Sequence, residues 1–192
     1  MIVGVLLAAG SSTRFGAHKL LHPLSDGIPI AAHAARHLIS ALPVSIAVVR
    51  REDVMLREML ANCGLTIVEC AAALQGMGAS IGCGASATPK AAGWVIALAD
   101  MPWVRPATIY SIAQQLRTGA GIVAPQYQGR RGHPVGFAGA FKARLLALQR
   151  DVGARELIEE SREHLVLNVT DDSGVLLDID LPKDVERNFS SC

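Results

Sequence analysis

The stretch LLAAGSSTRFGAHKLL, residues 6–21, joins an apolar run to a loop of small residues that ends in a cation. Val3 to Ala8 is apolar throughout, as expected for a strand buried on both faces of a parallel sheet. Beyond it, glycines let the backbone approach an oxyanion, and the hydroxyl groups of Ser11 and Ser12 add hydrogen-bond donors. Arg14 suits bidentate contact with phosphate oxygens, whereas Lys19 is a compact charge. The stretch therefore predicts a strand followed by an anion-binding loop.

The spacing of this loop differs from the common phosphate-binding motifs. In the pattern G-x-x-x-x-G-K-[ST] the lysine follows the second glycine directly, but here Gly10 and Gly16 lie one residue too far apart and Lys19 comes three residues after Gly16. The dinucleotide pattern G-x-G-x-x-G is absent. A plain Gly/Ser turn with two solvated cations remains the alternative interpretation.

Apolar runs of strand length alternate with segments of helical spacing along the chain. The expected strands are Val3 to Ala8, Val44 to Val49, Leu65 to Val68, Trp94 to Leu98, Gly121 to Ala124 and Leu165 to Val169. The expected helices are Pro29 to Leu42, Asp53 to Ala61, Pro106 to Leu116, Ala140 to Leu148 and Ala154 to Glu160, while Gly76 to Ala87 is either a weak helix or a binding loop. This alternation predicts a three-layer α/β/α fold with a mostly parallel central sheet. A length of 192 residues suits one domain, residues 1–192.

Composition excludes several kinds of protein. The formal net charge is +1 and the charges are scattered, so no basic stripe is present for nucleic acid. No apolar run reaches the roughly 18 residues that a membrane span needs, and the first residues have no signal-peptide pattern. The cysteines lack C-x-x-C spacing, which argues against zinc. We expect a cytoplasmic protein with reduced thiols, in which Cys63 and Cys83 are packing residues.

A carboxylate follows the buried strand Trp94 to Leu98. Asp100 stands in the sequence Ala99-Asp100-Met101-Pro102, at the strand end where open α/β sheets bind ligands. Mg²⁺ is typically held by one or two carboxylates together with phosphate oxygens. Asp100 is therefore a candidate metal ligand, and a role as a turn or helix cap is the alternative.

The loop and the acid together resemble one known family. The string LLAAGSSTRFGAHKLL resembles the G-x-x-x-R-x-G-x-x-K signature of the MobA-like nucleotidyltransferases, especially the cytidylyltransferase branch that acts on the molybdenum cofactor. The A-D-M-P string at Asp100 is similar to that family's metal-binding string. The resemblance runs from Val3 to Asp184 with the motifs in family order, and it implies a Rossmann-like nucleotidyltransferase fold.

The resemblance also implies roles for particular residues. Arg14, Lys19 and Asp100 are the expected catalytic residues, with Arg14 on the outer phosphates, Lys19 near the α-phosphorus and Asp100 on the metal. The expected nucleotide-binding residues are Leu7, Ala8, Ala9, Gly10, Ser11, Ser12, Arg14, Lys19, Gln75, Gly76 and Ser80.

Three C-terminal strings complete the expected site. Gly132-His133-Pro134 resembles the family's entry to a strand, and His133 is expected to bind the acceptor, with a structural role as the alternative. Arg155 in Asp151-Val152-Gly153-Ala154-Arg155 is expected near the acceptor phosphate, with a solvated helix start as the alternative. In LDIDLPKD, residues 177–184, Asp180 is expected to be a second metal ligand, and Asp178 and Asp184 are expected to be caps. Leu181 departs from the family pattern, which has threonine there.

The implied reaction is transfer of CMP from CTP to the phosphate of the molybdenum-pterin cofactor, with Mg²⁺ or Mn²⁺ as cofactor and a molybdoenzyme as recipient of the product. Ala9 suggests cytosine, because the guanylyl branch tends to have glycine there. Three alternatives stay open: a guanylyl- or other nucleotidyltransferase with another phosphorylated acceptor, an NAD(P)-linked oxidoreductase, and a carrier of the cofactor without catalytic activity.

Overall fold

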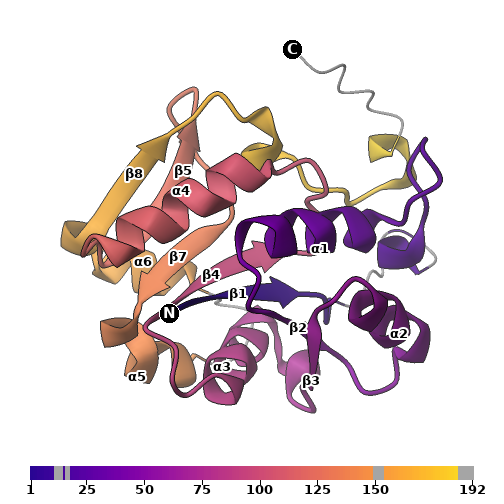
Figure 1. Ribbon diagram of the computed structural model, residues 1–192, viewed down its shortest axis with the longest axis horizontal. Coiled ribbons are helices and arrows are strands. Elements are labelled where there is room, and N and C mark those ends of the chain that lie inside the picture. Colours follow the sequence, from indigo (N-terminus) through magenta and orange to yellow (C-terminus); the bar gives the residue numbers. More distant parts are fainter. Residues whose placement is uncertain (11–14, 16–17, 149–153, 186–192) are drawn as a thin grey trace.

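The computed structural model describes residues 1–10, 15, 18–148 and 154–185. Within them, eight strands form one mixed sheet, and its neighbours follow the order β3-β2-β1-β4-β7-β5-β6, with β8 paired to β5 (Figure 1). These are β1 (Ile2–Leu7), β2 (Ser45–Val49), β3 (Thr66–Glu69), β4 (Gly93–Leu98), β5 (Ile122–Tyr127), β6 (Arg130–Arg131), β7 (Val135–Ala138) and β8 (Leu165–Val169). The pairs β1·β2, β1·β4, β2·β3 and β5·β8 are parallel, which confirms the expected, mostly parallel α/β sheet.

Alternate side chains of the strands point to two hydrophobic layers. On one face, Ile2 and Leu6 of β1 pack with α1 (Ile30–Ala41), α2 (Val54–Asn62) and α4 (Pro106–Arg117). On the other face, Val3 and Val5 pack with α3 (Met77–Ala87), α5 (Lys142–Leu146) and α6 (Arg155–Glu160). Because both faces are covered, β1 and β2 are buried at every position.

The helices follow the expected positions closely. Pro106 occupies the first turn of α4, where its missing N–H costs nothing, and Ile109, Ile112, Ala113 and Leu116 then form the buried stripe. The segment Gly76 to Ala87, which left two interpretations open, is the helix α3. The helix expected over Ala140 to Leu148 is shorter: α5 begins at Lys142, after a 3₁₀ turn (Gly139–Phe141).

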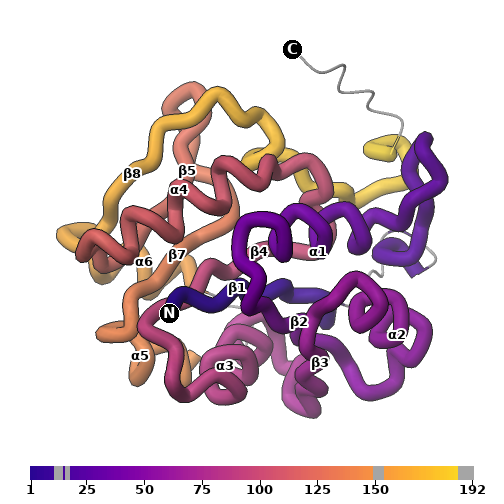
Figure 2. Tube along the Cα trace, in the orientation of Figure 1, coloured from indigo at the N-terminus to yellow at the C-terminus, as the bar shows by residue number. Residues whose placement is uncertain are grey.

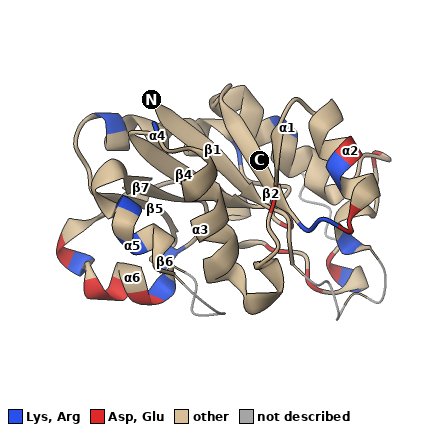
Figure 3. Ribbon diagram, turned by 90° about the horizontal axis from the view of Figure 1, so that it is seen from below, with Lys and Arg blue, Asp and Glu red and all other residues tan. Residues whose placement is uncertain are grey.

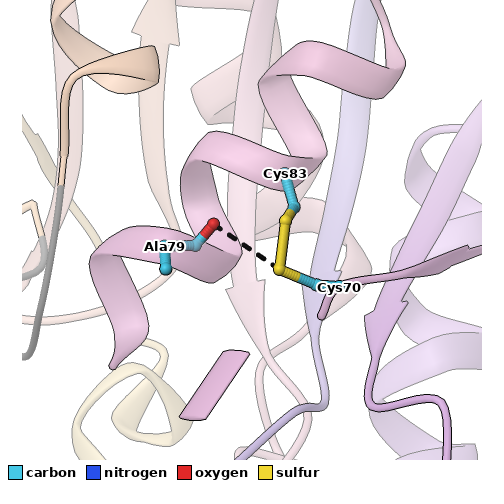
Figure 4. Close-up of a disulfide and its surroundings, with 3 residues drawn as sticks. All are labelled: Cys70, Ala79 and Cys83. Carbon is cyan, nitrogen blue, oxygen red and sulfur yellow. Dashed lines mark hydrogen bonds between the residues drawn. A yellow bond between two sulfur atoms is a disulfide. The ribbon is translucent and has the colours of Figure 1, made fainter. Parts of the chain in front are cut away.

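Two features differ from the sequence-based expectation. The strands β6 and β7 pair antiparallel with β5, and β7 also pairs antiparallel with β4. Cys70 and Cys83 form a disulfide, with their Cα atoms 6.0 Å apart, so the expectation of reduced thiols was wrong for this pair (Figure 4). Cys83 is therefore not simply a packing residue, whereas Cys63 is a free thiol. The fold brings the two sulfurs together across a sequence separation of 13, which no spacing motif reveals.

Charged residues of both signs are intermixed, as the scattered charges in the sequence predict. Figure 3 shows acidic and basic residues intermixed around α6 and near α2, and none on α3.

In Figure 2 the yellow C-terminal segment leaves β8 and returns to the indigo and purple N-terminal segments. Among the described residues, no helix combines the length and the apolar character needed to cross a membrane.

Candidate functional site

The candidate site lies where the strand order reverses. From β1 the chain proceeds to β2 and β3 on one side, and then crosses to β4 on the other side of β1. Leu7 and Leu98 are the last residues of β1 and β4, and they pair directly in the parallel register. Gly10 and Asp100 follow these two strand ends within three residues. Ligands of open α/β sheets bind at such a switch point, outside the carboxyl ends of the strands.

Lys19 provides a buried cation at this edge. It begins a 3₁₀ turn (Lys19–Leu21), and its side chain is only 9% exposed. Its Nζ donates a hydrogen bond to Asp100 Oδ2 at 2.8 Å and lies 3.6 Å from Asp180 Oδ1. The two carboxylates, which lie 80 residues apart in the sequence, therefore face one ammonium group.

The C-terminal segment that carries Asp180 is fastened on both sides of this residue. The backbone N–H of Ile179 donates to the carbonyl oxygen of Asp100 at 3.0 Å. The fully buried side chain of Ile179 packs with Phe15 and Ile30, which joins this segment to the N-terminal loop and to α1. On the other side, Asp184 Oδ2 accepts hydrogen bonds from the backbone of Asp180 and Leu181.

The three acids in LDIDLPKD, residues 177–184, differ in what their side chains contact. The hydrogen bonds made by Asp184 confirm that it is a cap. Asp178 is exposed and makes no side-chain hydrogen bond within the described part of the chain, so its expected role as a cap was wrong. Asp180 is the member of the string that the structure brings to Lys19 and Asp100.

A cavity of about 290 Å³ opens beside the ion pair. Its size approaches that of ordinary small-molecule sites. Its lining combines residues at the ends of β1 and β4, such as Gly10 and Asp100, with Lys19 and with residues 73–80 of the segment that joins β3 to α3 and begins this helix. The residues that line it are Leu7, Ala9, Gly10, Lys19, Leu20, Ala73, Leu74, Gly76, Met77, Ser80, Leu98 and Asp100.

The conformation of Gly76 shapes the part of the cavity wall that residues 73–80 form. This residue has φ of 123°, a conformation that side chains other than hydrogen rarely allow, and it joins a 3₁₀ turn (Ala73–Gln75) directly to α3. The sharp join places Ser80 inward, where it is 4% exposed, and leaves Leu74 and Met77 largely exposed at the cavity rim.

Not all expected nucleotide-binding residues line the cavity. Leu7, Ala9, Gly10, Lys19, Gly76 and Ser80 do. Ala8 is buried on the α1 face of β1, and Gln75 is exposed outside the cavity lining. Ser11, Ser12 and Arg14 lie outside the described residues.

The two expected acceptor-binding residues lie elsewhere. Arg155 begins α6 and is exposed, away from the cavity lining. His133 lies behind the site, where it shares a cavity of about 10 Å³ with His37 and Met101. Burial lowers the pKa of His133 below its ordinary value of 6.5, against the opposing effect of the Asp100 carboxylate, so its ring is neutral at pH 7. Its Nδ1 has no hydrogen-bond partner among the residues that the structure describes.

Five apolar residues of the lining were not among the expected nucleotide-binding residues, namely Leu20, Ala73, Leu74, Met77 and Leu98. Leu74 and Met77 stand next to Gln75 and Gly76, which were expected to bind the nucleotide. Large apolar residues exposed on both sides of a glycine turn are the signal that points to them.

The side chains at the carboxylate end fit a hard divalent ion. Asp100 and Asp180 supply carboxylate oxygens, the ligand type that Mg²⁺ and Mn²⁺ prefer, and a positive charge already lies between them. No cluster of three or more His, Cys, Asp or Glu residues suited to a metal occurs in the described ranges. An ion here would therefore take its remaining ligands from phosphate oxygens and water.

The fold and this site define a Rossmann-like α/β protein with a buried lysine and an acidic strand end at its switch point. The family model of the MobA-like NTP transferase domain matches residues 4–165, and the chain belongs to this family. No curated protein matches the chain in sequence.

Several solved structures share the fold. Rv0371c from Mycobacterium tuberculosis is 28% identical and superposes with a TM-score of 0.83, with 100% of each chain covered. A second structure of Rv0371c, in complex with manganese, has a TM-score of 0.79 and covers 97% of this chain and 96% of that one at 28% identity.

A nucleotidyl transferase from Methanothermobacter is 22% identical with a TM-score of 0.82, covering 96% of this chain and 94% of that chain. A 4-diphosphocytidyl-2C-methyl-D-erythritol synthase from Anaerococcus prevotii is 14% identical with a TM-score of 0.75, covering 96% and 92%. At these identities the last two show the fold alone, and they confirm the expected nucleotidyltransferase fold.

Proposed function

We propose that the chain, as one domain of residues 1–192, transfers CMP from CTP to the phosphate of the molybdenum-pterin cofactor and releases pyrophosphate. The observation that carries this proposal is the position of Lys19 Nζ between Asp100 and Asp180, in the lining of a cavity of about 290 Å³. A cation beside two carboxylates suits a metal-bound triphosphate, because the site then holds both signs of charge that the phosphates require.

The nucleotide is proposed to lie along the cavity, with its triphosphate at Gly10 and Lys19 and its base and ribose at Gly76 and Ser80. A Cβ atom added at Gly10 would meet no atom within 4 Å, so the backbone there is open to an approaching phosphate. We keep Arg14, Ser11 and Ser12 as phosphate contacts from their place in the loop, and Gln75 as a contact of the base. His133 and Arg155 stay proposed acceptor contacts, although neither lines the cavity.

In the proposed reaction, a phosphate oxygen of the acceptor attacks the α-phosphorus of the nucleotide in line. The new O–P bond forms as the bond from the α-phosphorus to the bridging oxygen breaks, and pyrophosphate leaves with that oxygen. A phosphate monoester is largely ionised at pH 7, because its second pKa is about 6, so the chain need not supply a general base. Lys19 stabilises the charge that develops on the α-phosphate, and Arg14 the charge on the pyrophosphate.

A divalent metal ion is proposed to bind at Asp100 and Asp180, where it would neutralise phosphate charge. Support comes from the carboxylate pair itself and from the manganese complex of Rv0371c. Lys19 must then give up its hydrogen bond to Asp100, which frees its ammonium group for the phosphates.

Cytosine is proposed as the base because Leu7 to Gly10 resembles the cytidylyl branch of the family, in which Ala9 replaces glycine. The name of the Anaerococcus relative also contains a cytidyl group. The pterin acceptor is proposed from the same resemblance.

Pyrophosphate release tests this function. We would measure it with CTP, GTP, ATP and UTP in turn, with Mg²⁺ or Mn²⁺, in the presence and absence of the molybdenum-pterin cofactor. The proposal expects release with CTP that depends on the acceptor, and its loss in Asp100→Asn. Asp178→Asn is the matched control, since this neighbouring acid is exposed and does not face Lys19.

Other outcomes would identify the alternatives. Release with GTP in preference to CTP would make the chain a guanylyltransferase. Absence of release with every nucleotide, together with tight binding of the pterin cofactor, would favour a carrier. Binding of NAD(P)H, followed by its fluorescence, would favour an oxidoreductase.

A further inference from the structure

The Cys70–Cys83 disulfide closes a loop around one wall of the cavity. Cys70 follows β3, and Cys83 lies in the second turn of α3 (Figure 4). Five of the twelve cavity-lining residues in the described chain belong to this loop, namely Ala73, Leu74, Gly76, Met77 and Ser80. The disulfide therefore joins the two ends of a segment that lines the same cavity as Lys19.

Packing restrains only part of this segment: Ala73 and Ser80 are buried, but Leu74 is 74% exposed and Met77 is 44% exposed. Among the described residues, no side chain caps the beginning of α3. The helix sequence MGASIGCGASA contains three glycines, which are poor helix formers. The N-terminal half of α3 is therefore intrinsically weak, and a covalent link at Cys83 holds it to the end of β3.

The far half of α3 is fixed independently of the disulfide. A Cβ atom at Gly84 would lie 2.7 Å from Val5 Cγ1, which shows how closely this part of the helix approaches β1. At the C-terminal end, Thr88 Oγ1 donates to the Gly84 carbonyl oxygen and accepts a hydrogen bond from Trp94. Breaking the disulfide would therefore loosen the cavity wall before it loosened the rest of the helix.

Reduction would change the contact that the Cys70 sulfur makes with Ala79. Cys70 Sγ lies 3.8 Å from the carbonyl oxygen of Ala79, the contact marked in Figure 4. A disulfide sulfur carries no proton, so this contact can become a hydrogen bond only in the thiol form, and it is then a weak one.

We infer that the Cys70–Cys83 pair is a redox control on nucleotide binding. The disulfide preorganises the part of the cavity wall that residues 73–80 form, and reduction of the disulfide by a dithiol weakens binding of the nucleotide. This inference rests on the proposed function. It also agrees with the expected cytoplasmic location, where the few disulfides that form are mostly transient and redox-sensing.

The exchange is a two-electron step. Cys70 is 2% exposed and Cys83 is half-buried, so a reductant thiolate attacks Cys83 Sγ and Cys70 leaves as a thiolate. The second thiol of the reductant then attacks the mixed disulfide and releases Cys83. The protein gains two electrons and two protons, and the reductant becomes a disulfide. Oxidised glutathione, a disulfide of low molecular weight, reverses the reaction.

The test measures the Kd of CTP with Mg²⁺ in a Cys63→Ser, Cys192→Ser background, where Cys70 and Cys83 are the remaining cysteines. The protein oxidised with glutathione disulfide is compared with the protein reduced by dithiothreitol and with the further Cys70→Ala, Cys83→Ala variant. We expect the last two to bind about tenfold more weakly, because binding must then order the loop. Amide hydrogen exchange over residues 71–82 should also accelerate in both.

The background itself should bind as the unaltered chain does, which controls for the loss of Cys63. Equal Kd values for the oxidised and reduced forms would overturn this inference while leaving the proposed function intact. Absence of binding by any nucleoside triphosphate in either form would overturn both. Unchanged hydrogen exchange over 71–82 would contradict the preorganisation of the wall.

Discussion

Lys19 is a buried cation whose ammonium group faces two carboxylates. Burying such a group costs free energy of desolvation, which the hydrogen bond to Asp100 and the nearby Asp180 offset. The same contacts mean that a divalent ion and Lys19 compete for Asp100. In the proposed reaction, Asp100 and Asp180 would hold a divalent ion, and the ammonium group of Lys19 would then be free to contact the phosphates.

Replacing Lys19 tests this exchange of partners. Lys19→Ala should lower the rate of nucleotidyl transfer by at least about a hundredfold, because the charge that develops on the α-phosphate loses its partner. Circular dichroism should show an intact fold. Lys90→Ala removes an exposed lysine from outside the cavity lining and is the control.

A metal-binding measurement complements the rate. Because Lys19 no longer occupies the carboxylates, Lys19→Ala should bind Mn²⁺ more tightly than the unaltered chain when no nucleotide is present, as followed by electron paramagnetic resonance. Near-normal turnover, or weaker binding of Mn²⁺, would contradict the role assigned to this lysine.

His37 predicts a dependence of stability on pH. Burial lowers its pKa from 6.5, and His33 acts in the same direction, while hydrogen bonding to the Val104 and Pro102 backbone and the charge of Asp172 oppose this. Below pH 6.5 the unfolded chain binds a proton at His37 that the folded chain does not. The free energy of unfolding should therefore fall as the pH decreases through this range.

Urea unfolding of His37→Gln at about pH 7.5 and pH 5.5 measures how much this histidine contributes to the change of the unfolding free energy with pH. The decrease in unfolding free energy between the two values should be smaller than in the unaltered chain. Comparing two pH values within one protein cancels the cost of the substitution itself. An equal decrease in both proteins would show that His37 contributes nothing to it.

At the scale of elements, a buried acid holds the C-terminal segment to the start of α4. Asp172 is 3% exposed. Its Oδ2 accepts hydrogen bonds from the Arg105 backbone N–H at 2.8 Å and from Thr108 Oγ1 at 2.7 Å, and its Oδ1 accepts one from the Gly174 backbone at 3.0 Å. These bonds connect the start of α4 to the segment that leads to Asp180.

Asp172→Ala should therefore destabilise the protein by about 2–4 kcal/mol, since it leaves three donors without their partner. The variant should also transfer nucleotide more slowly, because Asp180 loses part of its support. Asp171→Ala is the matched control: the side chain of Asp171 is 89% exposed, so solvent screens its surface ion pair with Arg105 and its loss should change stability little. Equal losses in both variants, measured by urea unfolding, would refute the role of Asp172.

At the scale of the whole molecule, the apolar pattern predicted six of the eight described strands to within a few residues. These strands are buried on both faces or lie beside such strands, so their sequences carry a strong signal. The strands β6 and β7 are short and surround Gly132, His133 and Pro134, and no run of apolar residues marks β6. The pattern therefore could not reveal the antiparallel half of the sheet.

The candidate site was predictable in part for a similar reason. Gly10 and Asp100 follow buried strands, so strand direction alone places them at one edge of the sheet. Asp180 follows no such strand, and only its resemblance to the family indicated it. Asp172 and the Cys70–Cys83 disulfide depend on contacts between distant segments, which leave no periodic trace in the sequence.

The most direct measurement is a crystal structure with Mn²⁺ and a CTP analogue that cannot be hydrolysed, in which anomalous scattering locates the metal. We expect one Mn²⁺ peak about 2 Å from carboxylate oxygens of Asp100 and Asp180, with Lys19 turned to the α-phosphate and the base against Gly76. A nucleotide bound outside this cavity, or Mn²⁺ bound away from both carboxylates, would contradict this expectation.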